Sequence, residues 1–85
     1  MTLAKIVAQN ISAARMRRKL SQQAVADKAA LSVSYISMLE RGLRSPPLET
    51  LEVLAKALSV PPMSLLQEDR TSSGGRRTGP KRKSV

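Results

Sequence analysis

The sequence predicts an all-α fold, a compact domain of five short helices. Its 85 residues are 41% hydrophobic but contain a single aromatic residue, Tyr35, so the core has to be built from Leu, Ile, Val, Met and Ala. These aliphatic residues recur three and four positions apart, which is the spacing of one face of an α-helix. Serine, glycine and proline residues separate the runs, so the helices are brief and their connections short. A chain of this length forms one small domain.

The first two helices are predicted from apolar spacing and from a serine that precedes the second. A helix over residues 3–18 places four apolar residues on one face: Leu3, Val7, Ile11 and Ala14. Its last turn is rich in arginine and lysine, which suits the negative end of the helix dipole. Ser21 can accept a hydrogen bond as the N-cap of a second helix that extends to Ala29.

The third helix is predicted to begin after Ser32, another serine N-cap, and to end at Glu40 or Arg41. Gly42 follows, and glycine readily takes the left-handed conformation that terminates helices. The helical period puts three apolar residues on the inward side: Leu31, Ile36 and Leu39. The outward side is small and mostly uncharged, and it consists of Val33, Ser34, Ser37, Met38 and Arg41.

Proline pairs open the last two predicted helices. The fourth helix follows the pair at 46–47 and carries a long apolar stripe made of Leu48, Leu51, Leu54, Ala55 and Leu58. The fifth is short, follows the pair at 61–62, and ends at Leu65 or Leu66. The second and third predicted helices, joined by a short link, have the lengths and the turn of a helix-turn-helix.

The charge of the chain is unevenly distributed. The 15 Lys and Arg exceed the 6 Asp and Glu by a formal charge of +9, with +6 on residues 1–44, −3 on residues 45–69 and +6 on residues 70–85. We expect residues 1–68 to form the folded domain. We expect residues 69–85 to be a disordered basic tail, because one apolar residue cannot offset the entropy of ordering it. The excess of positive charge indicates a polyanionic partner.

The residue types argue against most catalytic chemistry. The chain has no histidine and no cysteine, so it lacks an imidazole base, a thiolate nucleophile and the usual zinc ligands. Its acidic residues do not have the spacing of a metal-binding loop. We therefore expect no enzyme activity, no cofactor, no metal and no small-molecule substrate. The N-terminal stretch resembles neither a signal peptide nor a membrane span, so we expect a cytoplasmic protein without a membrane partner.

Residues 20–58, LSQQAVADKAALSVSYISMLERGLRSPPLETLEVLAKAL, resemble the Cro/C1-type (XRE-like) helix-turn-helix family of bacterial and phage regulators. The resemblance rests on Ser-Gln at 21–22, Val-Ala at 25–26, Ser-Tyr-Ile-Ser at 34–37, Leu-Glu-Arg-Gly at 39–42, Pro-x-Leu-x-x-Leu at 46–51 and Leu-Ala-Lys-Ala-Leu at 54–58. It extends over residues 3–66 and implies a lambda-repressor-like domain, either a phage-type repressor or a restriction-modification controller protein, encoded by a bacterium or a phage.

The resemblance implies that the second helix crosses the DNA backbone and that the third lies in the major groove. Gln22 would then meet a phosphate or a base edge, and Ser32 would donate to a phosphate. The residues expected to face base edges are Val33, Ser34, Ser37 and Met38. Arg41 and Arg44 would reach the backbone. Arg17 and Arg18 can contact phosphate or form a solvated helix end. Tyr35 can reach a phosphate with its hydroxyl or pack within the domain.

This sequence departs from the family at three positions, one of which is an expected DNA contact. Val33 stands where the family often has arginine or glutamine, so it cannot make the paired hydrogen bonds that read guanine or adenine. We therefore expect a larger share of recognition through DNA shape and backbone contacts. Ala30 and Ser59 replace glycines, and a positive φ at Ala30 would cost about 1 kcal/mol relative to glycine.

The resemblance also pairs Arg15 with Glu40, and we interpret the pair as structural because Glu40 would be costly to bury alone. A homodimer interface is expected on the fifth helix and the exposed side of the fourth, from Val53, Met63, Leu65 and Leu66. A protein that reads a half-site gains affinity and spacing from a two-fold partner. The acidic charge of residues 45–69 suits a surface held away from DNA.

The predicted function is a sequence-specific transcriptional regulator that binds a palindromic operator as a homodimer. Its expected partners are double-stranded DNA and a second copy of the chain, and activation would also require a surface for RNA polymerase. The main alternative is an antitoxin that binds a toxin and autoregulates its promoter. A second alternative is a nucleic-acid-binding adaptor that depends on charge alone.

Overall fold

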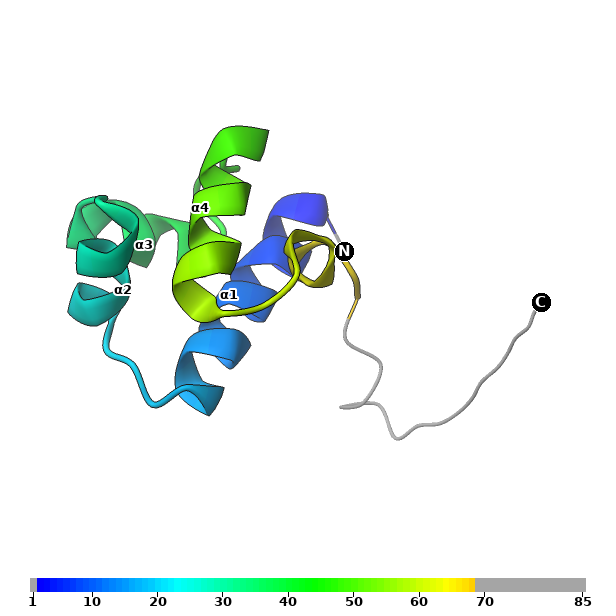
Figure 1. The fold of residues 1–85 in the computed structure, drawn as a ribbon. Helices are drawn as coiled ribbons and strands as arrows, with labels where there is room; N and C mark the ends of the chain where they lie inside the picture. The colour runs from blue at the N-terminus through cyan, green and yellow to red at the C-terminus, as the bar shows by residue number, and fades with distance from the viewer. Residues whose placement is uncertain (1, 69–85) are drawn as a thin grey trace.

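The structure, a computed structural model, describes residues 2–68, where the chain forms α-helices and one 3₁₀ turn but no strand. The elements in chain order are α1 (Leu3–Arg17), α2 (Gln22–Ala29), α3 (Val33–Glu40), α4 (Leu48–Leu58) and the 3₁₀ turn η1 (Pro62–Leu65). Figure 1 shows α2 and α3 at one end of the arrangement and η1 at the other, near the N-terminus. The all-α prediction is confirmed for these residues, and the predicted tail, residues 69–85, lies outside them.

The prediction of a fifth α-helix is wrong in the type of element. Pro62–Leu65 is one 3₁₀ turn, in which the Ser64 N–H donates to the Pro61 carbonyl at 3.0 Å. Such a bond spans three residues rather than four, and a segment of four residues is too short to propagate an α-helix. The first helix also ends at Arg17, one residue earlier than predicted, because Arg18 is its C-cap.

The first three helices begin with the same kind of cap. A hydroxyl oxygen in front of each helix accepts a hydrogen bond from the backbone N–H three residues later: Thr2 from Lys5 (3.2 Å), Ser21 from Ala24 (3.0 Å) and Ser32 from Tyr35 (3.1 Å). These bonds satisfy N–H groups that have no partner inside the helix. The predicted starts at Ser21 and Ser32 are confirmed, whereas α4 follows Pro47 without a side-chain cap.

Each of the four α-helices of residues 2–68 is followed, one or two residues after its end, by a residue with a left-handed backbone: Lys19 (φ 57°), Ala30 (φ 58°), Gly42 (φ 74°) and Ser59 (φ 58°). After each of these residues, the next N–H donates to a carbonyl five residues back, as Leu31 does to Ala26 at 2.9 Å. Glycine takes this conformation without steric cost, but a side chain at the same φ is unfavourable. Ala30 therefore has the positive φ at which alanine is less stable than glycine.

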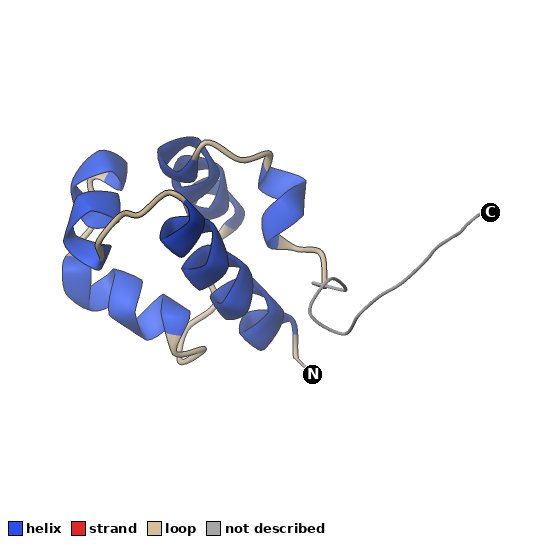
Figure 2. Cartoon of the chain, turned by 90° about the horizontal axis from the view of Figure 1, so that it is seen from below, coloured by secondary structure: helices blue, strands red, loops and turns tan. Residues whose placement is uncertain are grey.

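The core is aliphatic, as predicted, and draws on every helix and on η1. Its buried members are Val7, Ile11, Ala14, Val25, Ala26, Ala29, Ile36, Leu39, Leu51, Leu54, Ala55, Leu58 and Leu65. α1 packs against α3, α4 and η1, while α2 packs against α3 and α4, and the links between them are short (Figure 2). Leu3 and Leu48, expected in the apolar stripes, are instead exposed in the first turns of their helices.

Candidate nucleic-acid interface

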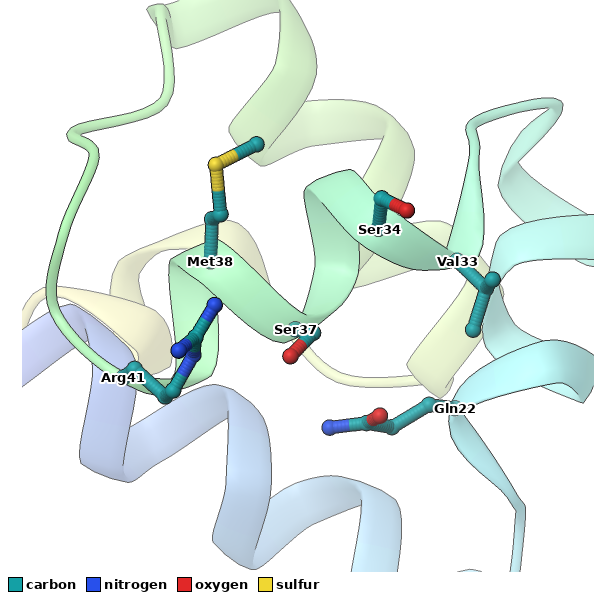
Figure 3. A pocket seen from close by; sticks show the side chains of 6 residues that line it. All are labelled: Gln22, Val33, Ser34, Ser37, Met38 and Arg41. Carbon is teal, nitrogen blue, oxygen red and sulfur yellow. The ribbon is translucent and has the colours of Figure 1, made fainter.

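The outward face of α3 forms one side of an open pocket (Figure 3). The lining side chains come from α3, from the residue that caps its end and from the first position of α2: Val33, Ser34, Ser37, Met38, Arg41 and Gln22. The opposite side of α3 is anchored in the core, where Ile36 and Leu39 are 0% and 1% exposed. The structure thus brings together six of the residues that the sequence predicts to contact DNA.

Apart from the guanidinium of Arg41, this pocket presents uncharged hydrogen-bonding groups and apolar groups. Ser34, Ser37 and Gln22 can donate and accept, whereas Val33 and Met38 present hydrocarbon and a thioether. An α-helix with such a surface suits the major groove, where base edges offer donors, acceptors and the thymine methyl group. Within residues 2–68, no group of three or more His, Cys, Asp or Glu side chains is placed to hold a metal ion.

None of the helices in the described part of the chain is long and apolar enough to cross a membrane.

Behind the pocket, Arg15 of α1 and Glu40 of α3 form a two-point ion pair. Arg15 Nε donates to Glu40 Oε2 at 2.7 Å, and Arg15 Nη2 donates to Glu40 Oε1 at 3.1 Å. The two side chains are 16% and 7% exposed, so both charges are largely removed from water. The hydrogen bond to Glu40 raises the pKa of Arg15 above its ordinary value, although burial acts in the opposite direction. Arg15 Nη1 also donates to the Leu20 carbonyl at 2.8 Å, which fixes the link before α2.

Gln22 is tied to the same carboxylate. Its Nε2 donates to Glu40 Oε1 at 3.1 Å, so this oxygen accepts from both Gln22 and Arg15. The sequence predicts a DNA contact for Gln22 and an ion pair with Arg15 for Glu40, but it does not indicate the contact between Gln22 and Glu40. The one available signal was that a buried carboxylate has more accepting positions than one arginine fills.

The remaining residues predicted to contact DNA lie outside the pocket lining. The Ser32 hydroxyl oxygen accepts the Tyr35 N–H at the start of α3, and the Tyr35 side chain packs, half-buried, against the core. Arg17 and Arg44 are exposed, at the end of α1 and in the link between α3 and α4. Both arginines are therefore accessible to a phosphate, whereas Tyr35 has a clear packing role.

Arg18, for which a phosphate contact or a solvated position is expected, is exposed and also makes two hydrogen bonds within the fold. Its Nε donates to the Leu58 carbonyl at 3.1 Å, and its Nη2 donates to the Ser59 carbonyl at 2.9 Å. These carbonyls lie at the C-terminal end of α4, where cations are favourable for the helix dipole. The sequence gives no sign of this contact, because its acceptors are backbone oxygens about forty residues away.

The residues expected in a dimer interface fall into two groups. Val53 and Met63 are 42% and 64% exposed, so they are accessible to a partner. Leu65 is 1% exposed and belongs to the core of its own chain, so its assignment to an interface is corrected. Leu66 is partly buried against the same core. The 3₁₀ geometry accounts for the error, since an α-helical period does not apply to η1.

Asn10 has a further structural role that its sequence pattern does not indicate. Its Nδ2 donates to the Leu65 carbonyl at 2.9 Å and to the Gln67 carbonyl at 2.7 Å. These two bonds fasten η1 and the residues after it to α1. They thereby fix where the exposed Met63 side chain stands on the surface.

Comparison with known proteins gives matches along most of the chain. Residues 11–65 match the helix-turn-helix family HTH_3. The immunity repressor protein of Bacillus phage phi105 is 43% identical over 63 residues, which are 74% of this chain and 44% of the repressor. The chain thus spans less than half the length of that relative. The control protein C.SmaI of Serratia marcescens is 37% identical over 76 residues, which are 87% of this chain and 90% of the control protein.

A solved structure shows the same fold bound to DNA. The restriction-modification controller protein C.Esp1396I, a tetramer in complex with its natural 35 base-pair operator, matches with a TM-score of 0.71 and 29% identity. The match covers 76% of this chain and 86% of that chain. The matched range 11–65 contains α2, α3 and all six residues of the pocket lining. The chain therefore belongs to HTH_3, the Cro/C1-type helix-turn-helix family of DNA-binding transcriptional regulators.

Proposed function

We propose that this protein is a sequence-specific regulator that binds a palindromic operator as a homodimer, with α3 in the major groove. The observation that carries the proposal is the outward face of α3, where an anchored helix presents small polar and apolar side chains beside Gln22. Arg17 and Arg44, both exposed, are the proposed phosphate contacts around this face, together with Arg41 and the hydroxyl of Ser32.

The chemistry of α3 supports recognition that depends in part on DNA shape. Val33 is 37% exposed at the start of α3 and can contact only apolar groups such as a thymine methyl. Ser34 and Ser37 accept and donate without strong discrimination among bases. We therefore propose that backbone contacts and DNA deformability contribute a larger share of specificity than in relatives with a polar first residue in the recognition helix.

The exposed residues Val53 and Met63 support a dimer interface on α4 and η1. They lie on the acidic part of the sequence, residues 45–69, whereas the proposed DNA contacts lie on the basic part. A two-fold partner would place two α3 helices about 34 Å apart, one helical turn of B-DNA. An operator with half-sites at that spacing is the expected target.

Protection mapping of the purified protein on DNA upstream of its own gene tests the proposal. The expected result is a protected region with two-fold symmetric half-sites, centred about 10 base pairs apart or at a multiple of that spacing. Protection without symmetry would contradict the homodimer, and uniform weak protection would contradict sequence specificity. The relatives from Bacillus phage phi105 and Serratia marcescens are an immunity repressor and a control protein, and C.Esp1396I is a restriction-modification controller protein, so they lend no support to the antitoxin alternative.

A further inference from the structure

The hydrogen bond between Gln22 and Glu40 determines which way the Gln22 amide points. An amide has one accepting end and one donating end, and its orientation follows from its partners. An ionised carboxylate only accepts, and Glu40 is held by two hydrogen bonds from Arg15, at 2.7 and 3.1 Å. An amide oxygen turned toward this carboxylate would be repelled. The nitrogen of Gln22 must therefore face Glu40, which is the arrangement observed at 3.1 Å.

This orientation limits what Gln22 can offer to a ligand in the pocket. Nε2 carries two hydrogens, and Glu40 accepts one of them. The other N–H and the carbonyl oxygen remain for the pocket that Gln22 helps to line. Phosphate oxygens only accept, so a phosphate would leave that carbonyl unpaired. The major-groove edge of adenine has the N6 donor and the N7 acceptor side by side, and it satisfies both groups of the amide.

We propose that Glu40 is a positioning residue for DNA recognition, which holds the Gln22 amide so that it reads an adenine through N6 and N7. Arg15 in turn holds Glu40, so the ion pair serves recognition as well as stability. The inference rests on the proposed function, because it requires α3 and the start of α2 to face the major groove. It also assigns to Gln22 the paired base contact that Val33 cannot make.

Burial makes the positioning effective. The Glu40 side chain is 7% exposed and hydrogen-bonded to Arg15 of α1. The carboxylate that accepts the Gln22 N–H is therefore held in one position by the fold. A glutamine amide that is already held by a hydrogen bond in the free protein loses less rotational freedom on binding DNA than a glutamine amide in water. The affinity for adenine should therefore fall when the attachment is removed, even if Gln22 itself is retained.

The adjacent residue supplies a matched control. Gln23 is exposed, and its Nε2 donates to Asp27 Oδ1 at 2.9 Å one turn further along α2. It has the same side chain and a carboxylate partner, but it does not line the pocket. Gln23→Ala should leave recognition unchanged.

Selection from a pool of randomised duplexes tests the proposal with the full chain as wild type, Gln22→Ala, Glu40→Leu and Gln23→Ala. Leucine at position 40 offers no acceptor to the Gln22 N–H, whereas glutamine would still offer its amide oxygen. Circular dichroism at the assay temperature establishes that each variant is folded. The wild type should select a motif with one adenine per half-site that depends on Gln22. Discrimination of that adenine against guanine should fall about 5- to 150-fold in Gln22→Ala, and by a similar factor in Glu40→Leu. Gln23→Ala should select the wild-type motif.

The double variant separates positioning from stability. If Glu40 acts through Gln22, then Gln22→Ala with Glu40→Leu should discriminate adenine no worse than Gln22→Ala alone. A merely structural Glu40 would weaken binding to every duplex by the same factor and leave the base preference intact.

The outcomes distinguish this inference from the proposed function. A wild type that selects no motif overturns both, whereas a motif that Gln22→Ala selects unchanged overturns the inference alone. A folded Glu40→Leu that keeps the adenine preference overturns the positioning role. If Glu40→Leu does not fold, nuclear magnetic resonance of the free wild type decides: the Gln22 side-chain N–H should exchange with water more slowly than that of Gln23, and equal rates overturn the inference.

Discussion

The guanidinium of Arg18 closes the C-terminal end of α4, with Nε 3.1 Å from the Leu58 carbonyl oxygen and Nη2 2.9 Å from that of Ser59. Arg17, its neighbour in sequence, is exposed at the end of α1. Two adjacent arginines thus have different surroundings, and substitutions should separate a stabilising role from a DNA-binding one.

Arg18→Ala should lower the free energy of unfolding by about 1–2 kcal/mol, because two carbonyls of α4 lose a charged donor. Arg17→Ala should change stability by less than about 0.5 kcal/mol but weaken DNA binding and reduce its salt slope by about 1. Chemical denaturation and titrations against duplex DNA at several salt concentrations measure these effects. Equal losses of stability in the two variants would contradict the assignment.

Ala30→Gly should raise stability, because Ala30 has φ 58° at the end of α2. Relief of the left-handed strain is worth about 1 kcal/mol, or roughly 4–8 °C in melting temperature for a domain of this size. Ser59→Gly, at φ 58° after α4, should act in the same direction. Ala24→Gly, inside α2, is the control and should lower the melting temperature. A lower melting temperature for Ala30→Gly would show that alanine is not strained there.

Glu40→Ala should destabilise the fold by about 3 kcal/mol, because it leaves the Arg15 guanidinium largely buried without its partner. Arg15→Met combined with Glu40→Leu should recover part of this loss, since neither charge then remains. The pKa of Arg15 is higher in the folded than in the unfolded chain. The charged Arg15 side chain therefore contributes fully to the free energy of unfolding at any pH below the unfolded pKa, and this contribution is lost only as pH rises through the folded pKa. The contribution from Arg15 should therefore not vary near neutral pH, and denaturation at several pH values tests this.

Met63→Glu should weaken self-association without lowering the stability of the monomer, because Met63 is 64% exposed. Leu65→Ala, two residues away, should instead cost about 2–5 kcal/mol of stability, since Leu65 is 1% exposed in the core. Sedimentation with and without operator DNA measures the first effect, and chemical denaturation measures the second. An unchanged association constant for Met63→Glu would contradict an interface at η1.

Local signals account for what the sequence could predict. The starts of α2 and α3 follow from serine caps, and the ends of α2 and α3 follow from the apolar period and from Gly42. The same apolar period predicts which side of α3 faces inward. It also places Ser34, Ser37 and Met38 together on the outward side. Each of these features depends on residues no more than a few positions apart.

Contacts between distant segments account for what the sequence could not predict. The acceptors of Arg18 and Asn10 are backbone carbonyls, which every residue has, so no residue type marks them. The bond from Gln22 to Glu40 depends on how closely α2 approaches α3. Leu65 was misassigned because a turn of four residues has no period from which an inward side can be read.

Removal of residues 70–85 should flatten the salt dependence of DNA binding, if these residues act as an arm on the DNA backbone. They carry six basic residues and no acidic one. Each phosphate that they neutralise contributes about 0.9 to the slope of log K against log salt. The selected motif should stay the same, because backbone contacts carry no base information. A chain of full length with the six bases changed to glutamine is the control for length, and it should match the truncated chain. An unchanged slope in both variants would mean that these residues take no part in binding DNA.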